Sequence, residues 1–182
     1  MTRRTLVLAV LALSGCGYNR IQSLDEQVGA FKGQIGVQLQ RRADLVPNLV
    51  EVVKGYATQE LAIFGELASA RAALSGAVQS GSVDSMAAAN TALSGALGRL
   101  IAIAEDNPEI KSNENFRALQ DQLEGTENRI AVARTDYNNA VRDYNAYIRR
   151  FPQVLTAKVT GAGPHQYFEA EAGAAAAPKV EF

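Results

Sequence analysis

The stretch FRALQDQLEGTENRIAVARTDYNNAVRDYNAYIRRFP, residues 116–152, carries the most regular pattern in the chain. Large apolar or aromatic residues recur every seven positions from Phe116 to Phe151, and a second set alternates with them from Leu119 to Tyr147. A strand would repeat every second residue, whereas this spacing places both sets on one face of a helix. The stretch therefore predicts a long helix, closed by Pro152, that packs nearly antiparallel against its neighbours.

Two earlier regions have the same periodicity. From Ile21 to Ile63 the apolar residues step by three and four on one seven-residue register. Three polar residues interrupt this register: Gln38, Arg42 and Gln59. A further helix is predicted over residues 83–104, because Ser80-Gly81-Ser82 breaks the pattern before it and Asp106-Asn107-Pro108 ends it. Long heptad-patterned helices throughout predict an all-α fold.

Pro47 leaves the path of the first region open. The register runs through Pro47 and places it on the outward face, which suits a kinked but continuous helix. A continuous helix over residues 19–78 would be about 90 Å long at 1.5 Å per residue. A reversal near Pro47 would instead give four helices of more similar length.

Cys16 is the only cysteine in 182 residues, and it follows a secretory signal pattern. Met1-Thr-Arg-Arg is a short basic segment, residues 5–13 are apolar, and Ser14-Gly15 places small residues before the cysteine. The apolar segment is far shorter than the roughly 20 residues that span a bilayer. LSGC resembles the lipobox of bacterial lipoproteins, in which the thiol is acylated and the chain is cut before the cysteine. An ordinary cleaved signal with an incidental cysteine is the alternative.

The lipobox interpretation predicts a signal peptide at residues 1–15, a helical bundle at 16–152 and a Gly/Ala-rich C-terminal tail at 153–182. The mature chain would have 16 basic and 19 acidic residues, a net charge of −3. Acyl chains such as palmitate on Cys16 would anchor it stably in a membrane outside the cytoplasm, because each buried CH₂ contributes about 0.8 kcal/mol. Gly17 stands where aspartate would resemble an inner-membrane retention signal, which favours the outer membrane in a cell with two membranes.

The tail after Pro152 is rich in glycine and alanine and ends in PKVEF. Disorder is one interpretation of this composition. The other is that its large apolar residues dock onto the bundle or a partner. These residues are Tyr167, Phe168, Val180 and Phe182.

Composition and spacing give no support to several kinds of site. A formal net charge of −1 and the absence of tryptophan argue against nucleic-acid binding. The only histidine is His165, so no helix supplies the Glu-x-x-His pairs that hold metals in bundles, and a zinc site is equally disfavoured. The glycines form neither a GxxxxGK[ST] loop nor a strand-borne GxGxxG motif, so nothing supports nucleotide binding. We therefore predict no catalytic residue, no metal and no cofactor; a Ser-His-acid triad would have to use His165.

Two clusters of polar residues lie close to the predicted core positions. One surrounds Pro47 and the other lies midway along the third helical region. The members are Arg41, Arg42, Asp44, Asn48, Glu51 and Lys54, and Glu127, Asn128, Arg129 and Arg134. If the clusters face each other, they would form an interhelical network that fixes register. Partner recognition is the alternative role.

Four stretches together resemble the LemA family of bacterial membrane-associated proteins. They are VQLQRRADLVPNLVEVVKGYA (37–57), LSGALGRLIAIAEDNPEIKSNENF (93–116), LQDQLEGTENRIAVARTDYNNAVRDYNAYIRRFP (119–152) and the final PKVEF. The resemblance implies an all-α antiparallel bundle of the four-helix type, tethered to a membrane by its N-terminus, with no established enzymatic activity. Family members typically carry a longer N-terminal transmembrane helix, and this chain has the apparent lipobox in its place.

These observations favour a non-enzymatic, lipid-anchored scaffold or adaptor that acts through helix-mediated contacts with a protein partner or with itself. A binding module for an envelope ligand is a second hypothesis, with Tyr137, Tyr144 and Tyr147 as contacts, although the same tyrosines occupy core positions. An adaptor of a membrane protease or quality-control system is a third. A hydrolase is disfavoured by the shortage of titratable groups.

Overall fold

The computed structural model describes residues 3–56 and 61–169, with side chains from residue 17 onward. Every regular element in these residues is a helix, which confirms the predicted all-α class. The helices are α1 (Arg3–Lys54), α2 (Leu61–Ser80), α3 (Val83–Glu105), α4 (Pro108–Ser112), α5 (Glu114–Ile148) and α6 (Gln153–Thr160). They form two compact units, unit 1 (residues 1–34 and 133–167) and unit 2 (residues 35–132 and 168–182), and α1 and α5 contribute to both.

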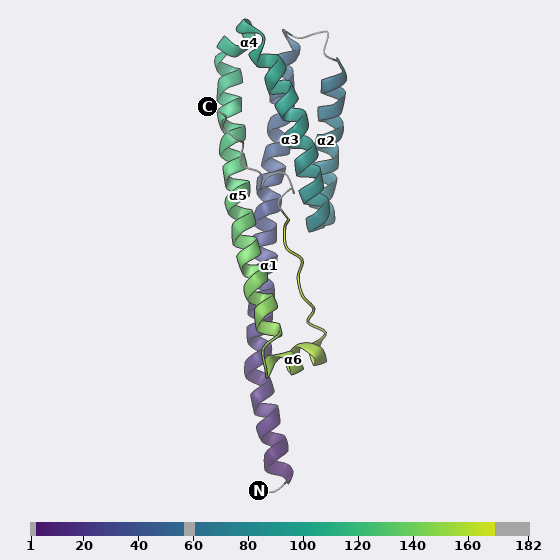
Figure 1. Ribbon diagram of the computed structural model, residues 1–182, viewed down its shortest axis with the longest axis vertical. Helices are drawn as coiled ribbons and strands as arrows, with labels where there is room; N and C mark the ends of the chain where they lie inside the picture. Colours follow the sequence, from purple (N-terminus) through teal and green to yellow (C-terminus); the bar gives the residue numbers. More distant parts are fainter. Residues whose placement is uncertain (1–2, 57–60, 170–182) are drawn as a thin grey trace, which may run out of the picture. The chain divides into compact units, whose positions relative to one another are not determined.

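Unit 2 is an antiparallel bundle of four helices, namely the C-terminal part of α1, α2, α3 and the N-terminal part of α5 (Figure 1). Lys54 at the end of α1 lies near Phe64 at the start of α2, and Gly36 of α1 lies near Val78 at the end of α2, so these two helices are antiparallel. Figure 1 shows the same alternation in α3 and α5. The core is filled by fully enclosed aliphatic side chains from all four helices, including Leu39, Leu67 and Leu93. This is the up-down-up-down arrangement that short connections favour.

The predicted boundaries of α3 are confirmed. Ser82 is the N-cap, and its hydroxyl accepts a hydrogen bond from the backbone N–H of Ser85. Gly81 before it has φ 67°, a conformation that glycine adopts without strain. At the other end Asp106 caps α3, and Asn107 caps the short helix α4. These local signals turn the chain from α3 into α5.

The first helical region continues through Pro47 and ends at Lys54, so the reversal considered at Pro47 does not occur there. Proline has no N–H to donate to the carbonyl four residues earlier, which here is that of Ala43. Arg71 Nε of α2 donates to this carbonyl at 3.0 Å. A side chain from the neighbouring helix therefore replaces the lost bond, and α1 remains helical.

The buried stripe of α1 changes between the two units. In unit 1 it follows the predicted register through Ile21, Leu24 and Val28. In unit 2 the stripe is wider and includes residues one position beyond that register. It comprises Ile35, Leu39, Arg42, Ala43, Val46, Leu49 and Val53. The wider stripe is expected where a helix packs against two neighbours rather than one.

Unit 1 consists of the N-terminal part of α1, the C-terminal part of α5, α6 and the segment 161–167 (Figure 1). The helix predicted to end at Pro152 ends at Ile148. Phe151, placed in the core by the heptad pattern, is instead 80% exposed. Residues 153–160, predicted as tail, form α6, and Gly161 ends this helix in the left-handed conformation with φ 72°.

The segment after α6 packs on α5 through side chains that reach its backbone. Tyr137 donates its hydroxyl hydrogen to the carbonyl of Gln166 at 2.8 Å. Asn145 donates to the carbonyl of His165 and accepts from its N–H, both at 2.9 Å. Phe168 is buried and Tyr167 is 44% exposed, while Val180 and Phe182 lie outside the described residues. The described part of the tail is thus fixed by specific contacts.

Within the described residues, α2 and α3 are each long and apolar enough to cross a membrane, with a mean hydropathy of 1.3. One side of each helix packs in unit 2, where Leu67, Leu74 and Leu100 are fully buried, whereas Leu61 at the start of α2 is 73% exposed. Arg99 and Glu66 also pair on their exposed sides. These contacts are those of core helices in a bundle.

Candidate functional site

Arg42 is the centre of a polar layer inside unit 2. It projects from α1, and only 8% of its side chain is exposed. Its Nη1 donates to Oδ1 of Asn90 on α3 at 2.7 Å and forms an ion pair with Oε2 of Glu127 on α5 at 2.5 Å. One guanidinium thus connects three helices. The structure therefore brings together one member from each of the two polar clusters in the sequence.

Burial lowers the pKa of Arg42, and the charge of Glu127 acts in the opposite direction. A guanidinium remains charged at any physiological pH, so the protein must balance this buried charge. Asn90 and Glu127 supply that balance, although Nε of Arg42 has no hydrogen-bond partner within the described residues. Removing either partner would leave a buried cation undercompensated, which is more costly than never having buried it.

Asn90 was not among the sequence candidates. It occupies a core position of α3 between Met86 and Leu93, and it is 6% exposed. A lone amide in an otherwise apolar heptad seam is a known device for fixing register, so its spacing could have identified it.

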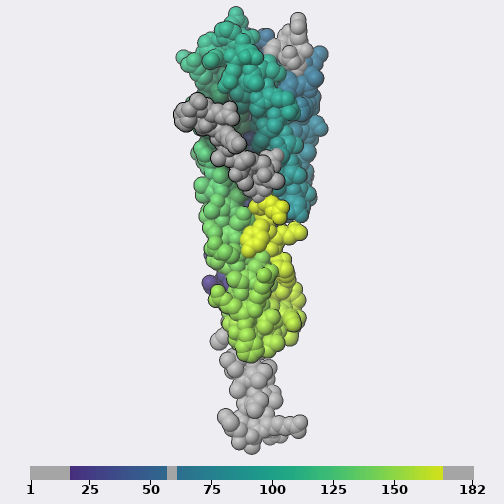
Figure 2. Space-filling view, in the orientation of Figure 1, coloured from purple at the N-terminus to yellow at the C-terminus, as the bar shows by residue number. Residues whose placement is uncertain are grey.

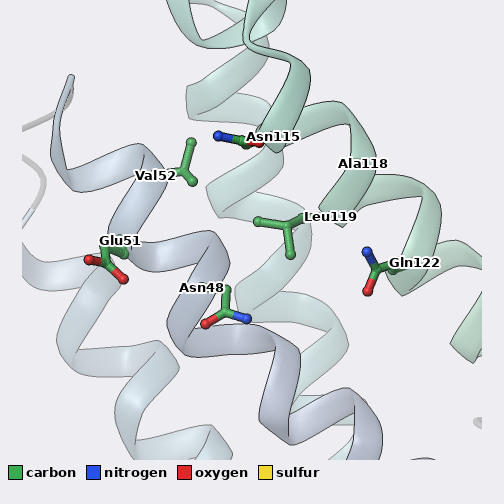
Figure 3. A pocket seen from close by; sticks show the side chains of 7 residues that line it. All are labelled: Asn48, Glu51, Val52, Asn115, Ala118, Leu119 and Gln122. Carbon is green, nitrogen blue, oxygen red and sulfur yellow. The ribbon is translucent and has the colours of Figure 1, made fainter.

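A groove of about 500 Å³ lies beside this layer, between α1 and α5 of unit 2. Figure 3 shows its amide side chains, Asn48 from α1 and Asn115 and Gln122 from α5, around the apolar Val52 and Leu119. Glu51 is also part of its wall. The groove offers hydrogen-bond donors and acceptors beside apolar side chains, a mixture that protein interfaces also have.

A second groove, of about 390 Å³, is lined by Pro47 and lies between α1 and α2. Glu51 borders this groove too, together with Lys54 and Arg71. Lys54 is engaged there, because its Nζ lies 5.3 Å from the ring centre of Phe64.

The remaining sequence candidates do not converge on one site. Asp44 accepts a hydrogen bond from Gln40 on its own helix. Arg41, Asn128 and Arg129 are exposed on unit 2. Arg134 belongs to unit 1 and is half-buried. The ten candidates thus divide into a buried ion pair, a groove lining and separate surface positions.

The tyrosines considered as ligand contacts are packing residues. Tyr137 and Tyr144 are 2% and 3% exposed, and Tyr147 is half-buried. The ring of Tyr144 lies 4.6 Å from that of His165, centre to centre. Burial raises the pKa of Tyr144, and the negative charge of Asp25 adds to the shift.

His165 contributes to the same contact. Its Nε2 lies 2.5 Å from Oδ1 of Asp25 on α1, while its backbone is bonded to Asn145. The imidazole therefore holds the segment between α1 and α5. Within the described residues, no group of three or more His, Cys, Asp or Glu is placed to hold a metal ion.

Comparison of the sequence with known families tests the resemblance to the LemA family. The sequence profile of the LemA family matches residues 32–182, which include both groove-lining segments and the whole of α5. The chain belongs to the LemA family. The matched range includes Arg42, Glu127 and Asn145, whose side chains connect helices or hold the segment after α6.

Relatives within the curated proteins are magnetosome proteins. Magnetosome proteins MamQ 1 and MamQ 2 of Paramagnetospirillum magneticum are each 28% identical over 186 residues, covering 90% of this chain and 68% of theirs. Magnetosome protein MamQ of Magnetospirillum gryphiswaldense is 29% identical over 174 residues, covering 83% of this chain and 64% of its own length. The similarity therefore extends across both units of this LemA-family chain.

Proposed function

We propose that this LemA-family protein is a non-enzymatic scaffold or adaptor, attached through acyl chains on Cys16 to a membrane outside the cytoplasm. It acts by presenting helical faces of unit 2 to a protein partner or to a second copy. In a cell with two membranes, the outer membrane is the proposed location. Similarity to magnetosome proteins, named for a bacterial organelle, is compatible with a role in organising a membrane surface.

The observation that supports the anchoring part of the proposal is the packing of residues that closely follow Cys16. Gly17 is buried, and a methyl group in place of its hydrogen would lie 3.5 Å from Oγ1 of Thr156 on α6. Ile21, one helical turn later, is 1% exposed. Cleavage before Cys16 would remove none of these packed residues, so the mature chain would start directly at its folded part.

The polar layer and the groove receive different roles. Arg42, Asn90 and Glu127 fix the register of unit 2, because a buried charge accepts few alternative arrangements. Arg41, Asp44, Asn48, Glu51, Lys54, Asn128, Arg129 and Arg134 remain candidates for partner contact. Asn48 and Glu51 are the strongest of these, since they line the groove in Figure 3.

Site-specific photocrosslinking in intact cells tests the adaptor role. A photoreactive residue replaces Gln122, which lines the groove, and a matched control places it at Asp121, which is exposed but points about 100° away on the same helix. Each variant is compared in the wild-type and Cys16→Ser backgrounds, and adducts are identified by mass spectrometry.

The proposal predicts one defined protein adduct from Gln122, weaker or absent from Asp121, and lost when Cys16→Ser prevents acylation. A self-adduct with this position dependence assigns a self-assembling scaffold. Equal adducts from both positions, or an adduct that Cys16→Ser leaves unchanged, would contradict the anchored adaptor.

A further inference from the structure

Helix α6 carries large apolar residues on the face that points away from unit 1. Leu155 is 55% exposed and Val159 is 88% exposed, and they lie four residues apart, hence on one helix face. Phe151, four residues before Leu155, is 80% exposed. We call these three residues the apolar face of unit 1; helix α6, which carries two of them, is yellow-green in Figure 2.

The opposite face of α6, which packs on the protein, is smaller and more polar. It consists of Ala157, which is buried, and of the half-buried Gln153, Val154 and Thr156, with Val154 as its one large apolar residue. Gln153 and Thr156 lie against Gly17 of α1. A helix on the surface of a soluble protein ordinarily has the reverse arrangement, with its large apolar residues inward. The outward apolar face is therefore unusual and needs a partner that is itself apolar.

Basic residues flank the apolar face. Arg149 and Arg150 precede it, Lys158 lies between Leu155 and Val159, and all three are exposed. No acidic residue occurs between Asp143 and Glu169. Exposed apolar residues bordered by positive charge are characteristic of helices that lie in the interface of anionic lipid membranes.

The position of α6 beside Gly17 of α1 indicates which membrane surface is available. Gly17, the residue on which α6 packs, directly follows Cys16 in the chain. We propose that Phe151, Leu155 and Val159 insert into an anionic lipid surface as a second membrane contact beside the acylated Cys16, an inference that rests on the proposed anchoring.

The second contact would fix orientation rather than supply affinity. More than one acyl chain already gives stable attachment. A single anchored residue nevertheless leaves the protein free to rotate about its tether, whereas two contacts on one side of unit 1 restrict that rotation. The consequence is a defined set of faces directed toward partners.

Fluorescence quenching tests the contact, because the chain has no tryptophan. The Val159→Trp variant of the full chain is produced in a bacterium that processes lipoproteins. It is then reconstituted into vesicles of phosphatidylglycerol and phosphatidylcholine with brominated acyl chains. The matched control is Val132→Trp, a 61% exposed valine on α5 in unit 2. The mass of the N-terminal peptide reports acylation of Cys16 in the same sample.

We expect an about twofold loss of Val159→Trp fluorescence, because a residue of an interfacial helix reaches about 5–10 Å into the acyl boundary, and little loss for Val132→Trp. An acylated protein with no quenching at position 159 would overturn this inference and leave the anchoring intact. Quenching without acylation would retain the lipid contact and refute the anchor. Blue-shifted emission without quenching would assign the face to protein contact, such as a second copy, and would also overturn the inference.

Discussion

Unit 2 encloses a charged side chain, whereas unit 1 exposes large apolar ones. Four helices surround Arg42 in unit 2, and two of them supply its partners Asn90 and Glu127. In unit 1 only α1 and α5 are long helices, and the core is completed by α6 and a segment held through Tyr137 and Asn145. Unit 1 thus has fewer long helices than unit 2 to cover its large side chains, and its apolar face is left exposed.

The largest expected effect is the loss of stability when a buried leucine is replaced by alanine, which tests how completely each unit encloses its core. Leu39 of unit 2 is fully buried, and Leu24 of unit 1 is 4% exposed. We expect Leu39→Ala to lower the free energy of unfolding by about 4 kcal/mol and Leu24→Ala by about 2 kcal/mol, because the less enclosed site can relax around the smaller residue. Urea denaturation measures both. Equal losses would remove the distinction between the units.

The ion pair in unit 2 should show strong coupling. Arg42→Ala removes a buried side chain and leaves Asn90 without its donor, so the free energy of unfolding should fall by about 2–3 kcal/mol. Glu127→Ala leaves a buried cation, but the Glu127 side chain is itself half-exposed, so the expected loss is about 1–2 kcal/mol. The double variant should lose about 1 kcal/mol less than the sum. Purely additive losses would exclude a direct pairing of the two residues.

In unit 1 the corresponding test is Asn145, which is bonded to both the N–H and the carbonyl of His165. Asn145→Ala should cost about 1–2 kcal/mol through two lost hydrogen bonds. It should also accelerate hydrogen exchange at His165 much more than in unit 2. Asn139→Ala, at an exposed position of the same helix, is the control. Unchanged exchange at His165 would show that other contacts hold the segment.

The bond that supports Pro47 should have a smaller effect. Arg71→Ala leaves the carbonyl of Ala43 without its donor and should cost about 1 kcal/mol. In a Pro47→Ala background residue 47 regains an N–H for that carbonyl, so the same Arg71 change should cost less. If Arg71→Ala costs the same in both backgrounds, Arg71 does not compensate for the proline.

The smallest expected effect is the dependence of the unfolding free energy on alkaline pH through Tyr144 of unit 1. The pKa of Tyr144 is raised in the folded chain, so the folded state holds this proton more tightly than the unfolded state. The contribution of Tyr144 to the stability of the folded chain is fully present below the ordinary tyrosine pKa of 10.0, and it is lost as pH rises through the raised pKa. Unfolding free energies from pH 9 to 11 should therefore decline less steeply in Tyr144→Phe. Parallel curves for the two chains would contradict the shift.

The sequence predicted α3 and the start of the long helix α5 because their signals are local. The heptads of α5 and the cap at Ser82 specify helix and boundary without reference to other elements. Arg42 could be singled out because it stands at a core position, and Asn90 could have been found by the same criterion. No local sequence signal indicates that Arg42 and Asn90 are in contact, because that depends on how the helices pack.

The ends of α1 and α5 were harder to predict because the heptad register continues past them. Gly55 follows Lys54 as a helix terminator would, yet apolar residues remain in register as far as Ile63. Phe151 likewise continues the register of α5, although the helix has ended at Ile148. The heptad pattern therefore continues beyond the helix where tertiary packing sets the boundary. Helix α6 was missed because the residues after Pro152 were assigned to a Gly/Ala-rich tail.

The most direct test of the anchoring account is the mass of the N-terminal peptide of the protein isolated from membranes of the cell that makes it. The account predicts a chain that begins at Cys16 and carries acyl groups, and that is released from the membrane only by detergent. A chain that retains residues 1–15, or one that begins elsewhere with an unmodified Cys16, would contradict it.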